Sequence, residues 1–169
     1  MDKRKMMFRQ EKNESGATKI YIYDDITAQG PFNWETWEYD ESETSAKYFI
    51  SLLNSIPDGS DIELHINSCG GEVKEGVAIY NLLKAKQANK VCHIDCFAYS
   101  VAYVVALGCD KIIMHRGSTI LLHNMWCTCS GNADQLRKAA DDLDELMAAN
   151  RQIFLEKCNL GEDELIEML

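Results

Sequence analysis

Hydrophobic and polar residues alternate with two different periods along this chain. Some stretches repeat every second residue, which is typical of a strand with one buried face, and others repeat every third or fourth residue, which is typical of a helix. The strand period is clearest at Asp61–Asn67, where Ile62, Leu64 and Ile66 lie on one side. The pattern predicts strands at 19–23, 61–67, 91–97, 111–114 and 119–122, and helices at 46–56, 72–88, 101–107 and 131–157.

The predicted elements follow the order β-α-β-α-β-α-β-β before the long helix. This alternation favours an α/β fold with a mostly parallel sheet and right-handed crossovers. Functional groups in such folds gather where strands end and helices begin. Gly70-Gly71 and Ser100 fall at two such turns, and His123 ends its own strand. We therefore expect these three features to meet at one edge of the sheet.

Two stretches lack a clear period. Residues 28–43 contain Pro31, Trp34, Trp37 and several acids, and we expect a loop whose aromatic side chains act as anchors, with an exposed binding face as the alternative. Residues 1–18 are polar, and we expect a mobile terminal segment. The remaining residues, 19–169, then form one domain, which is the default for a chain of 169 residues with 46% hydrophobic content.

Charge and hydropathy narrow the functional classes. A formal net charge of −10 argues against a nucleic-acid or anionic-membrane partner, because both require a basic surface. No apolar run reaches the roughly 18 to 20 residues that span a bilayer. We therefore expect a soluble, cytoplasmic protein.

Seven cysteines form an odd set spread over predicted strands and turns. Reduced thiols that pack as small apolar side chains explain them more simply than a disulfide framework. Cys92 with Cys96, and Cys127 with Cys129, lack the spacing and the second pair of a zinc site. We expect no metal and no cofactor. His65, His93 and His115 are expected to be structural or solvent-facing.

Three segments carry the candidate chemistry: Asn67–Gly71, Phe97–Ala102 and Thr119–His123. A serine hydroxyl is a weak nucleophile that needs an adjacent base, and a histidine can supply it. Ser100 opens an apolar helix and His123 ends an apolar strand, so the two form a candidate nucleophile and general base.

An oxyanion also needs fixed donors, for which the N–H groups of Gly71 and Val101 are the candidates. Each feature has an ordinary alternative. Ser100 could be only an N-cap, Gly70-Gly71 only a turn, and His123 a core histidine. Their combination in this order favours a serine acyl-transfer site.

Several motifs together resemble the Clp-type serine peptidase family, which includes the proteolytic subunit of the Clp protease and prophage-encoded relatives. They are Ile66–Gly71, Gly76–Tyr80, Ala98–Ser100, Gly108 with Asp110, and Leu121–Asn124. The resemblance covers roughly residues 60 to 160. The wider crotonase-like superfamily shares the fold of repeated β-α-β units without being peptidases, so an acyl-CoA enzyme is an alternative.

The resemblance implies a serine endopeptidase that works through an acyl-enzyme. By resemblance, Gly70, Gly71, Asn124 and Met125 would bind the substrate peptide. It also implies homo-oligomeric rings, commonly heptamers stacked in pairs through a long projecting helix. An ATP-dependent unfoldase would feed such a ring in a cell, and phage capsid proteins are the alternative substrates.

The chain departs from the family pattern in three ways. Cys69 stands where the family usually has proline, and Phe97 and Tyr99 stand where small residues are common. The family's third triad member is an acid that would fall just beyond Leu169, and neither Asp163 nor Glu167 matches its motif. The chain is then a truncated form lacking the family's C-terminal portion, a weak enzyme, or a catalytically inactive ring subunit.

Overall fold

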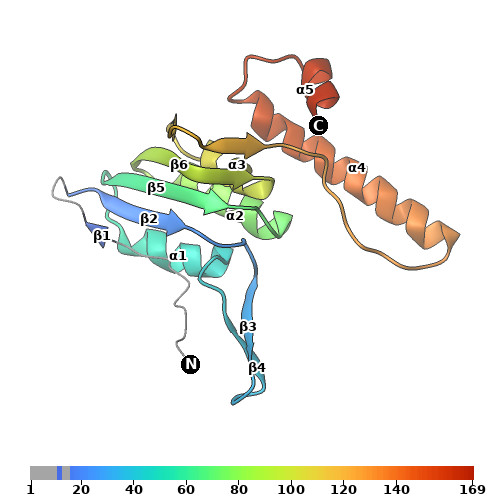
Figure 1. Ribbon diagram of the computed structural model, residues 1–169, viewed down its shortest axis with the longest axis horizontal. Helices are drawn as coiled ribbons and strands as arrows, with labels where there is room; N and C mark the ends of the chain where they lie inside the picture. Colours follow the sequence, from blue (N-terminus) through green and yellow to red (C-terminus); the bar gives the residue numbers. More distant parts are fainter. Residues whose placement is uncertain (1–10, 13–15) are drawn as a thin grey trace. The chain divides into compact units, whose positions relative to one another are not determined.

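The computed structural model describes residues 11–12 and 16–169, and it divides the chain into two compact units, residues 1–121 and residues 122–169. Figure 1 shows the elements of both units in sequence colours. The strands are β1 (Glu11–Lys12), β2 (Thr18–Ile22), β3 (Gln29–Asn33), β4 (Glu38–Glu41), β5 (Asp61–Ser68), β6 (Asn89–Tyr99), β7 (Lys111–Met114) and β8 (Thr119–Leu121). The helices are α1 (Ala46–Ser55), α2 (Val73–Ala85), α3 (Val101–Leu107), α4 (Ala133–Leu155) and α5 (Glu162–Met168).

The main sheet of the first unit has the order β1-β2-β5-β6-β7, with β8 also paired to β6. All of these pairs are parallel except β1 with β2. Because neighbouring strands from β2 to β7 follow chain order, right-handed crossovers place α1, α2 and α3 on one face (Figure 1). The predicted α/β class with a mostly parallel sheet is confirmed, and so is the long C-terminal helix, α4.

The core lies between this sheet and its three helices. Alternate residues of β5 are buried, and the apolar ones among them are the three that the sequence pattern placed on one side: Ile62, Leu64 and Ile66. Helices α2 and α3 approach closely, since a Cβ atom on Gly76 would lie 2.2 Å from Cγ2 of Val101. Glycine at position 76 therefore sets how deeply the first turn of α3 packs.

Strand β6 is long, and its outer partner changes along its length. Its first half pairs with β7, from Val91 with Lys111 to Ile94 with Met114. Its second half pairs with β8, ending at Tyr99 with Leu121. The switch follows the turn at Gly117, whose φ of +83° favours glycine. As a result β8 reaches the carboxyl end of β6, where α3 begins.

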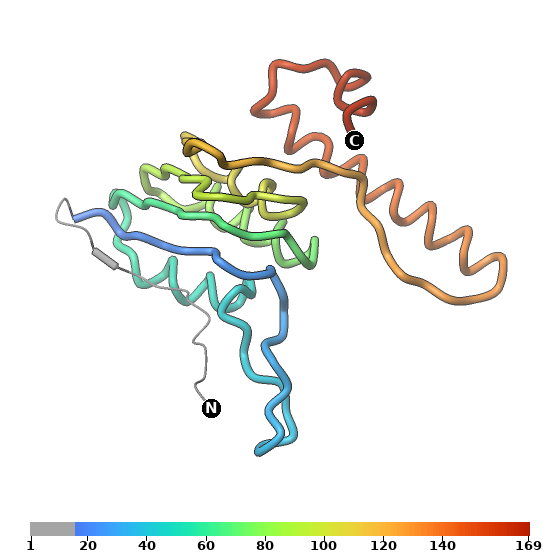
Figure 2. Tube along the Cα trace, in the orientation of Figure 1, coloured from blue at the N-terminus to red at the C-terminus, as the bar shows by residue number. Residues whose placement is uncertain are grey.

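The expectation of a loop at residues 28–43 is wrong, because these residues form an antiparallel hairpin of β3 and β4. Figure 2 shows it leaving the sheet where β2 ends and returning to the start of α1. Trp34 and Trp37 are not anchors, since each is 74% exposed. Aromatic and polar residues alternate in two runs, Phe32–Glu35 and Trp37–Asp40, but each run is only four residues long and gives no clear period. Within the described ranges the hairpin pairs with no other strand.

The remaining predictions differ little from the structure. Helix α2 is shorter than expected and β6 is longer, by a few residues at each end. The predicted mobile segment, residues 1–18, falls mostly outside the described residues. The limits of the predicted domain stay a prediction.

The second unit consists of an extended segment, α4 and α5. Helix α4 begins with a capping box in which the Asn132 side chain accepts the N–H of Gln135 and the Gln135 side chain accepts the N–H of Asn132. The buried apolar residues are Met147 and Phe154 on α4 and Leu165 on α5. No helix in the described ranges combines the length and the apolar character needed to cross a membrane.

The sheet face opposite the helices carries a row of stacked rings. In order across the sheet they are Tyr21, His65, His93 and His115, with successive ring centroids 4.9, 4.7 and 5.3 Å apart. The parallel register explains the row, because Tyr21 pairs with His65 and His65 pairs with His93. The order of these side chains therefore depends on strand pairing rather than on sequence proximity.

The carboxylate of Asp95 contacts two histidines of this row and the neighbouring Tyr23. It accepts a hydrogen bond from the Tyr23 hydroxyl, and its Oδ2 lies 2.9 Å from Nδ1 of His65. Nε2 of His115 lies 3.5 Å from Oδ1 of the same carboxylate. Burial raises the pKa of Tyr23 well above its usual range, and the adjacent Asp95 raises it further, so this hydroxyl stays a donor.

The row predicts a pH dependence of stability centred on His93. Burial lowers its pKa from the ordinary 6.5, and electrostatic repulsion from neighbouring His65 and His115 lowers it further, against a smaller opposite effect of Glu63 and Asp95. The unfolded chain then takes up a proton at higher pH than the folded chain. This contribution to stability is full above about pH 6.5 and is lost as the pH falls through the lower folded value.

Urea denaturation at several pH values between about 7 and 5 measures this effect. We expect the free energy of unfolding to fall across that range. In His93→Phe the free energy of unfolding should depend less steeply on pH, because phenylalanine keeps a ring in the row but has no nitrogen to take up a proton. Identical slopes for the two proteins would contradict the assignment.

Candidate active site

Ser100 lies at the turn between β6 and α3, and its backbone is strained. Its φ of 54° and ψ of −132° lie in a region that non-glycine residues rarely adopt. Such strain persists only where the surrounding structure imposes it, and it clusters at functional sites. A serine on a tight strand-to-helix turn presents its hydroxyl at the end of the sheet, which is the geometry known as a nucleophile elbow.

The side chain of Ser100 does not cap α3, although the residue occupies the N-cap position. The interpretation of this serine as only an N-cap is therefore wrong. Its backbone is held by other contacts, since its N–H donates to the carbonyl of Leu121 at 2.8 Å and its carbonyl accepts the N–H of Tyr103 at 3.1 Å. The end of β8 thus fixes the turn and leaves the hydroxyl available.

Gly70 lies directly against this turn. A Cβ atom on Gly70 would lie 2.8 Å from Cβ of Ser100 and 2.8 Å from the carbonyl oxygen of Tyr99. Its φ of +103° also disfavours any side chain. The turn of Gly70 and Gly71 can therefore approach Ser100 only because residue 70 is glycine.

Gly71 pairs on its other side with Ile26. The N–H of Ile26 donates to the carbonyl of Gly70 at 2.7 Å, and the N–H of Glu72 donates to the carbonyl of Ile26 at 2.8 Å. Successive peptide groups of an extended chain point to opposite sides, so the N–H of Gly71 points away from Ile26. Among the described residues this N–H has no acceptor, as expected for a group that could bind an oxyanion or a substrate carbonyl.

Sequence reasoning assigned no individual role to two residues that shape this edge. Asn67 lies where the β5–β6 register shifts, and its Oδ1 accepts the N–H of Phe97 at 3.3 Å. The shift adds residues to β6 just before Ser100, as bulges beside functional sites often do. The signal available in the sequence was an amide residue at the end of an otherwise apolar strand.

The second residue is Glu72, which follows the glycine pair. Its Oε1 accepts the N–H of Ala28 at 3.0 Å, and its Oε2 lies 3.0 Å from the ammonium of Lys74. The hydrogen bond from Ala28, with the contact to Lys74, lowers the pKa of Glu72. A charged carboxylate therefore joins the glycine turn to the base of the hairpin.

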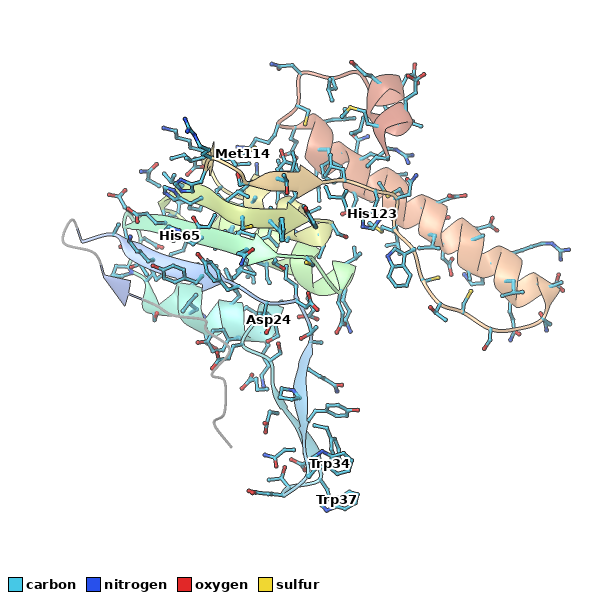
Figure 3. The ribbon with its side chains drawn as sticks, viewed as in Figure 1. Asp24, Trp34, Trp37, His65, Met114 and His123 are labelled. Carbon is cyan, nitrogen blue, oxygen red and sulfur yellow. The ribbon has the colours of Figure 1, made fainter. Side chains whose placement is uncertain are left out.

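The second unit contains the other predicted site residues, His123, Asn124 and Met125 (Figure 3 labels His123). Nδ1 of His123 lies 2.6 Å from the carbonyl oxygen of Asn124. Because a carbonyl only accepts, Nδ1 carries the proton and Nε2 is left as a base. The pairing of His123 with Ser100 stays a prediction, as do the substrate-binding roles of Asn124 and Met125.

Other candidate chemistry lies away from this edge or is not organised as a site. All seven cysteines are free thiols. In the part of the chain that the structure describes, no group of three or more His, Cys, Asp or Glu side chains is arranged to hold a metal ion. A pocket of about 580 Å³ is lined by Asp58–Gly59 and Lys86–Asn89, at the amino ends of β5 and β6 rather than at the candidate site.

Comparison with known families gives one finding. A family model described as Clp protease matches residues 35–168. The matched range includes every residue of the candidate site, from Gly70 to Met125.

The close approach of Gly70 to Ser100 predicts a specific defect in Gly70→Ala. The new Cβ must displace the Ser100 turn, so we expect a loss of about 2 to 3 kcal/mol in the free energy of unfolding and weaker reaction of Ser100 with a fluorophosphonate. Urea denaturation and the labelling rate measure the two effects.

Gly59→Ala is the matched control, because Gly59 has a φ of +78° and a Cβ atom there would meet no described residue within 4 Å. It should cost about 1 kcal/mol, the backbone contribution alone, and leave labelling unchanged. Equal effects of the two substitutions would show that the contact with Ser100 has no consequence.

Proposed function

Because this chain belongs to the Clp protease family, we propose that it is a serine endopeptidase whose nucleophile is Ser100 and whose general base is His123. The observation that carries the proposal is the strained turn at Ser100, which holds an uncapped hydroxyl against the Gly70-Gly71 turn. The family match makes a peptidase a better explanation of this serine than a crotonase-like acyl-CoA enzyme.

In the proposed reaction, Oγ of Ser100 attacks the carbonyl carbon of a peptide bond while Nε2 of His123 takes the hydroxyl proton. The resulting tetrahedral intermediate collapses, the C–N bond breaks, and the leaving amine receives that proton. His123 then takes a proton from water, which attacks the acyl-enzyme, and the collapse of this second intermediate releases the acid and restores the serine.

The oxyanion of each intermediate is stabilised by the N–H groups of Gly71 and Val101. The orientation of the Gly71 peptide away from Ile26 supports this role. Val101 is the first residue of α3, so its N–H is one that the helix itself does not use. The loss of one such donor typically costs a factor of about 10² to 10³ in rate.

Two features support His123 as the base. The carbonyl of Leu121 accepts the N–H of Ser100. His123 follows Leu121 by two residues, a stretch of chain that spans at most about 7 Å. In addition, the contact with the Asn124 carbonyl selects the tautomer with a basic Nε2. A neutral carbonyl stabilises an imidazolium less than a carboxylate does, so we expect slow turnover without a third acid.

Members of this family generally form oligomeric rings and act on protein substrates. We propose a homo-oligomeric ring, heptameric or of stacked heptamers, in which α4 contributes to stacking. In the cytoplasm, an ATP-dependent unfoldase delivers protein substrates to this ring. If the protein comes from a phage, its substrates are capsid proteins. The net charge of −10 favours neither nucleic acid nor a membrane as a partner.

A fluorophosphonate probe followed by mass spectrometry tests the nucleophile. We expect one probe per chain, attached to Ser100, and no labelling in Ser100→Ala. Ser51→Ala, at an exposed position on α1, should label like the unmodified protein. If Ser100 stays unlabelled in the assembled protein, the chain is a catalytically inactive ring subunit.

Substitution of the base gives a second test. His123→Gln should lower the rate of peptide hydrolysis by about 10² to 10⁴, because general-base catalysis contributes a factor of that size. His115→Gln, at an exposed histidine on the open face of the sheet, should retain activity. Hydrolysis that persists in His123→Gln would assign the base to another residue.

A further inference from the structure

The hairpin of β3 and β4 displays a cluster of aromatic side chains that the first unit does not bury. Its members are Phe32, Trp34, Trp37 and Tyr39, and we call them the aromatic cluster. Trp34 and Trp37 are each 74% exposed and Tyr39 is 58% exposed. Figure 3 shows the two tryptophans together at the tip, with ring centroids 6.1 Å apart. Exposed aromatic groups of this kind mark binding surfaces.

The rings of the cluster hold one another in edge-to-face contacts. Phe32 lies at the centre, with ring centroids 4.8 Å from Trp34, 6.3 Å from Trp37 and 5.2 Å from Tyr39. The turn is fixed as well, because Oδ1 of Asn33 accepts the N–H of Glu35 at 3.0 Å and its carbonyl accepts the N–H of Trp37 at 2.9 Å. The tryptophan faces are thus presented in a defined arrangement.

The base of the hairpin contacts the glycine turn of the candidate active site. Buried hydroxyl groups hold its two ends together, since Oγ1 of Thr44 donates to the carbonyl of Asp25 at 2.7 Å and lies 2.9 Å from Oγ of Ser42. Ile26, one residue before this base, pairs with Gly71, and Glu72 accepts the N–H of Ala28. The same short segment therefore supports both the oxyanion turn and the aromatic cluster.

The charge of the hairpin indicates what it binds. Residues 28–43 contain five acids and no lysine, arginine or histidine; the acids are Glu35, Glu38, Asp40, Glu41 and Glu43. Within the described ranges, Glu35 and Glu38 form no ion pair, and they flank Trp37 and its neighbour Thr36 at the tip. Tryptophan faces attract cations, and nearby carboxylates add to that attraction.

We propose that the hairpin is a specificity element that binds arginine or lysine side chains of an extended polypeptide substrate. The proposal rests on the proposed peptidase function of Ser100. Eight residues of chain lead from Ile26, beside Gly71, to Trp34 at the tip, and at about 3.3 Å per residue they span at most about 26 Å. An extended substrate has the same rise, which places the preferred basic residues within about eight positions of the cleaved bond.

Binding can be measured without catalysis. In the full chain carrying Ser100→Ala and Trp126→Phe, all tryptophan emission comes from Trp34 and Trp37, because the chain has three tryptophans. A 12-residue peptide with three arginines at one end should change this emission saturably. A peptide with glutamates in their place should bind at least about tenfold more weakly.

Specificity is measured in the active protein with peptides that carry arginines either about five to eight positions from the cleaved bond or next to it. Trp34→Ala with Trp37→Ala should lower kcat/KM about tenfold for the distant placement and leave the rate of fluorophosphonate labelling at Ser100 unchanged. Glu35→Gln with Glu38→Gln should reduce the preference for arginine over glutamate. Asp141→Asn with Asp144→Asn, on exposed positions of α4, removes the same charge and should not.

The outcomes separate this inference from the proposed function. Labelling of Ser100 together with equal binding of both peptides overturns the hairpin's role alone. Absence of labelling overturns the peptidase, whereas the emission titration still tests the hairpin. Tryptophan emission that is shielded from acrylamide before any peptide is added means that another subunit covers the cluster, which also overturns the inference.

Discussion

The backbone of Gly70 lies so close to Ser100 that no side chain fits between them, and the rest of the site depends on this contact. It holds the serine in a strained conformation that neither its residue type nor helix capping would favour. Three neighbours impose the strain: β8 fixes the serine N–H, α2 packs on the first turn of α3 at Gly76, and the glycine turn closes from the side. A hydroxyl restrained in this way needs little reorganisation before it attacks a carbonyl.

The glycine turn connects Ser100 with the rest of the first unit. Its inner side faces Ser100 and its outer side pairs with Ile26, so its N–H and C=O groups divide between the turn at Ser100 and the start of the hairpin. Glu72 strengthens that connection with a charge-assisted hydrogen bond to Ala28. A change in the hairpin can therefore affect substrate binding without contact with Ser100.

The sequence pattern was sufficient for the parts of the fold whose side chains separate into a buried and an exposed face. Strand β5 and helix α1 were found for this reason. The hairpin was missed because its two alternating runs, Phe32–Glu35 and Trp37–Asp40, are only four residues each and place Trp34, Trp37 and Tyr39 at exposed positions rather than in a core. The register shift at Asn67 and the φ of Ser100 are imposed by neighbouring elements, and the residue types at these two positions alone do not encode them. The histidine row is likewise a product of strand pairing. For the site, residue types and order singled out Ser100 and the glycine pair, and the structure places Gly70 against Ser100. Their catalytic roles, and the partnership of His123 with Ser100, still rest on sequence.

A crystal structure of the protein with a peptide boronate tests the central claim most directly, because a boronate mimics the tetrahedral intermediate. The account predicts boron bonded to Oγ of Ser100, a positive φ at that residue, and a boronate oxygen within about 3.2 Å of the N–H groups of Gly71 and Val101. A relaxed Ser100 whose hydroxyl caps α3, with the boronate bound elsewhere, would contradict it.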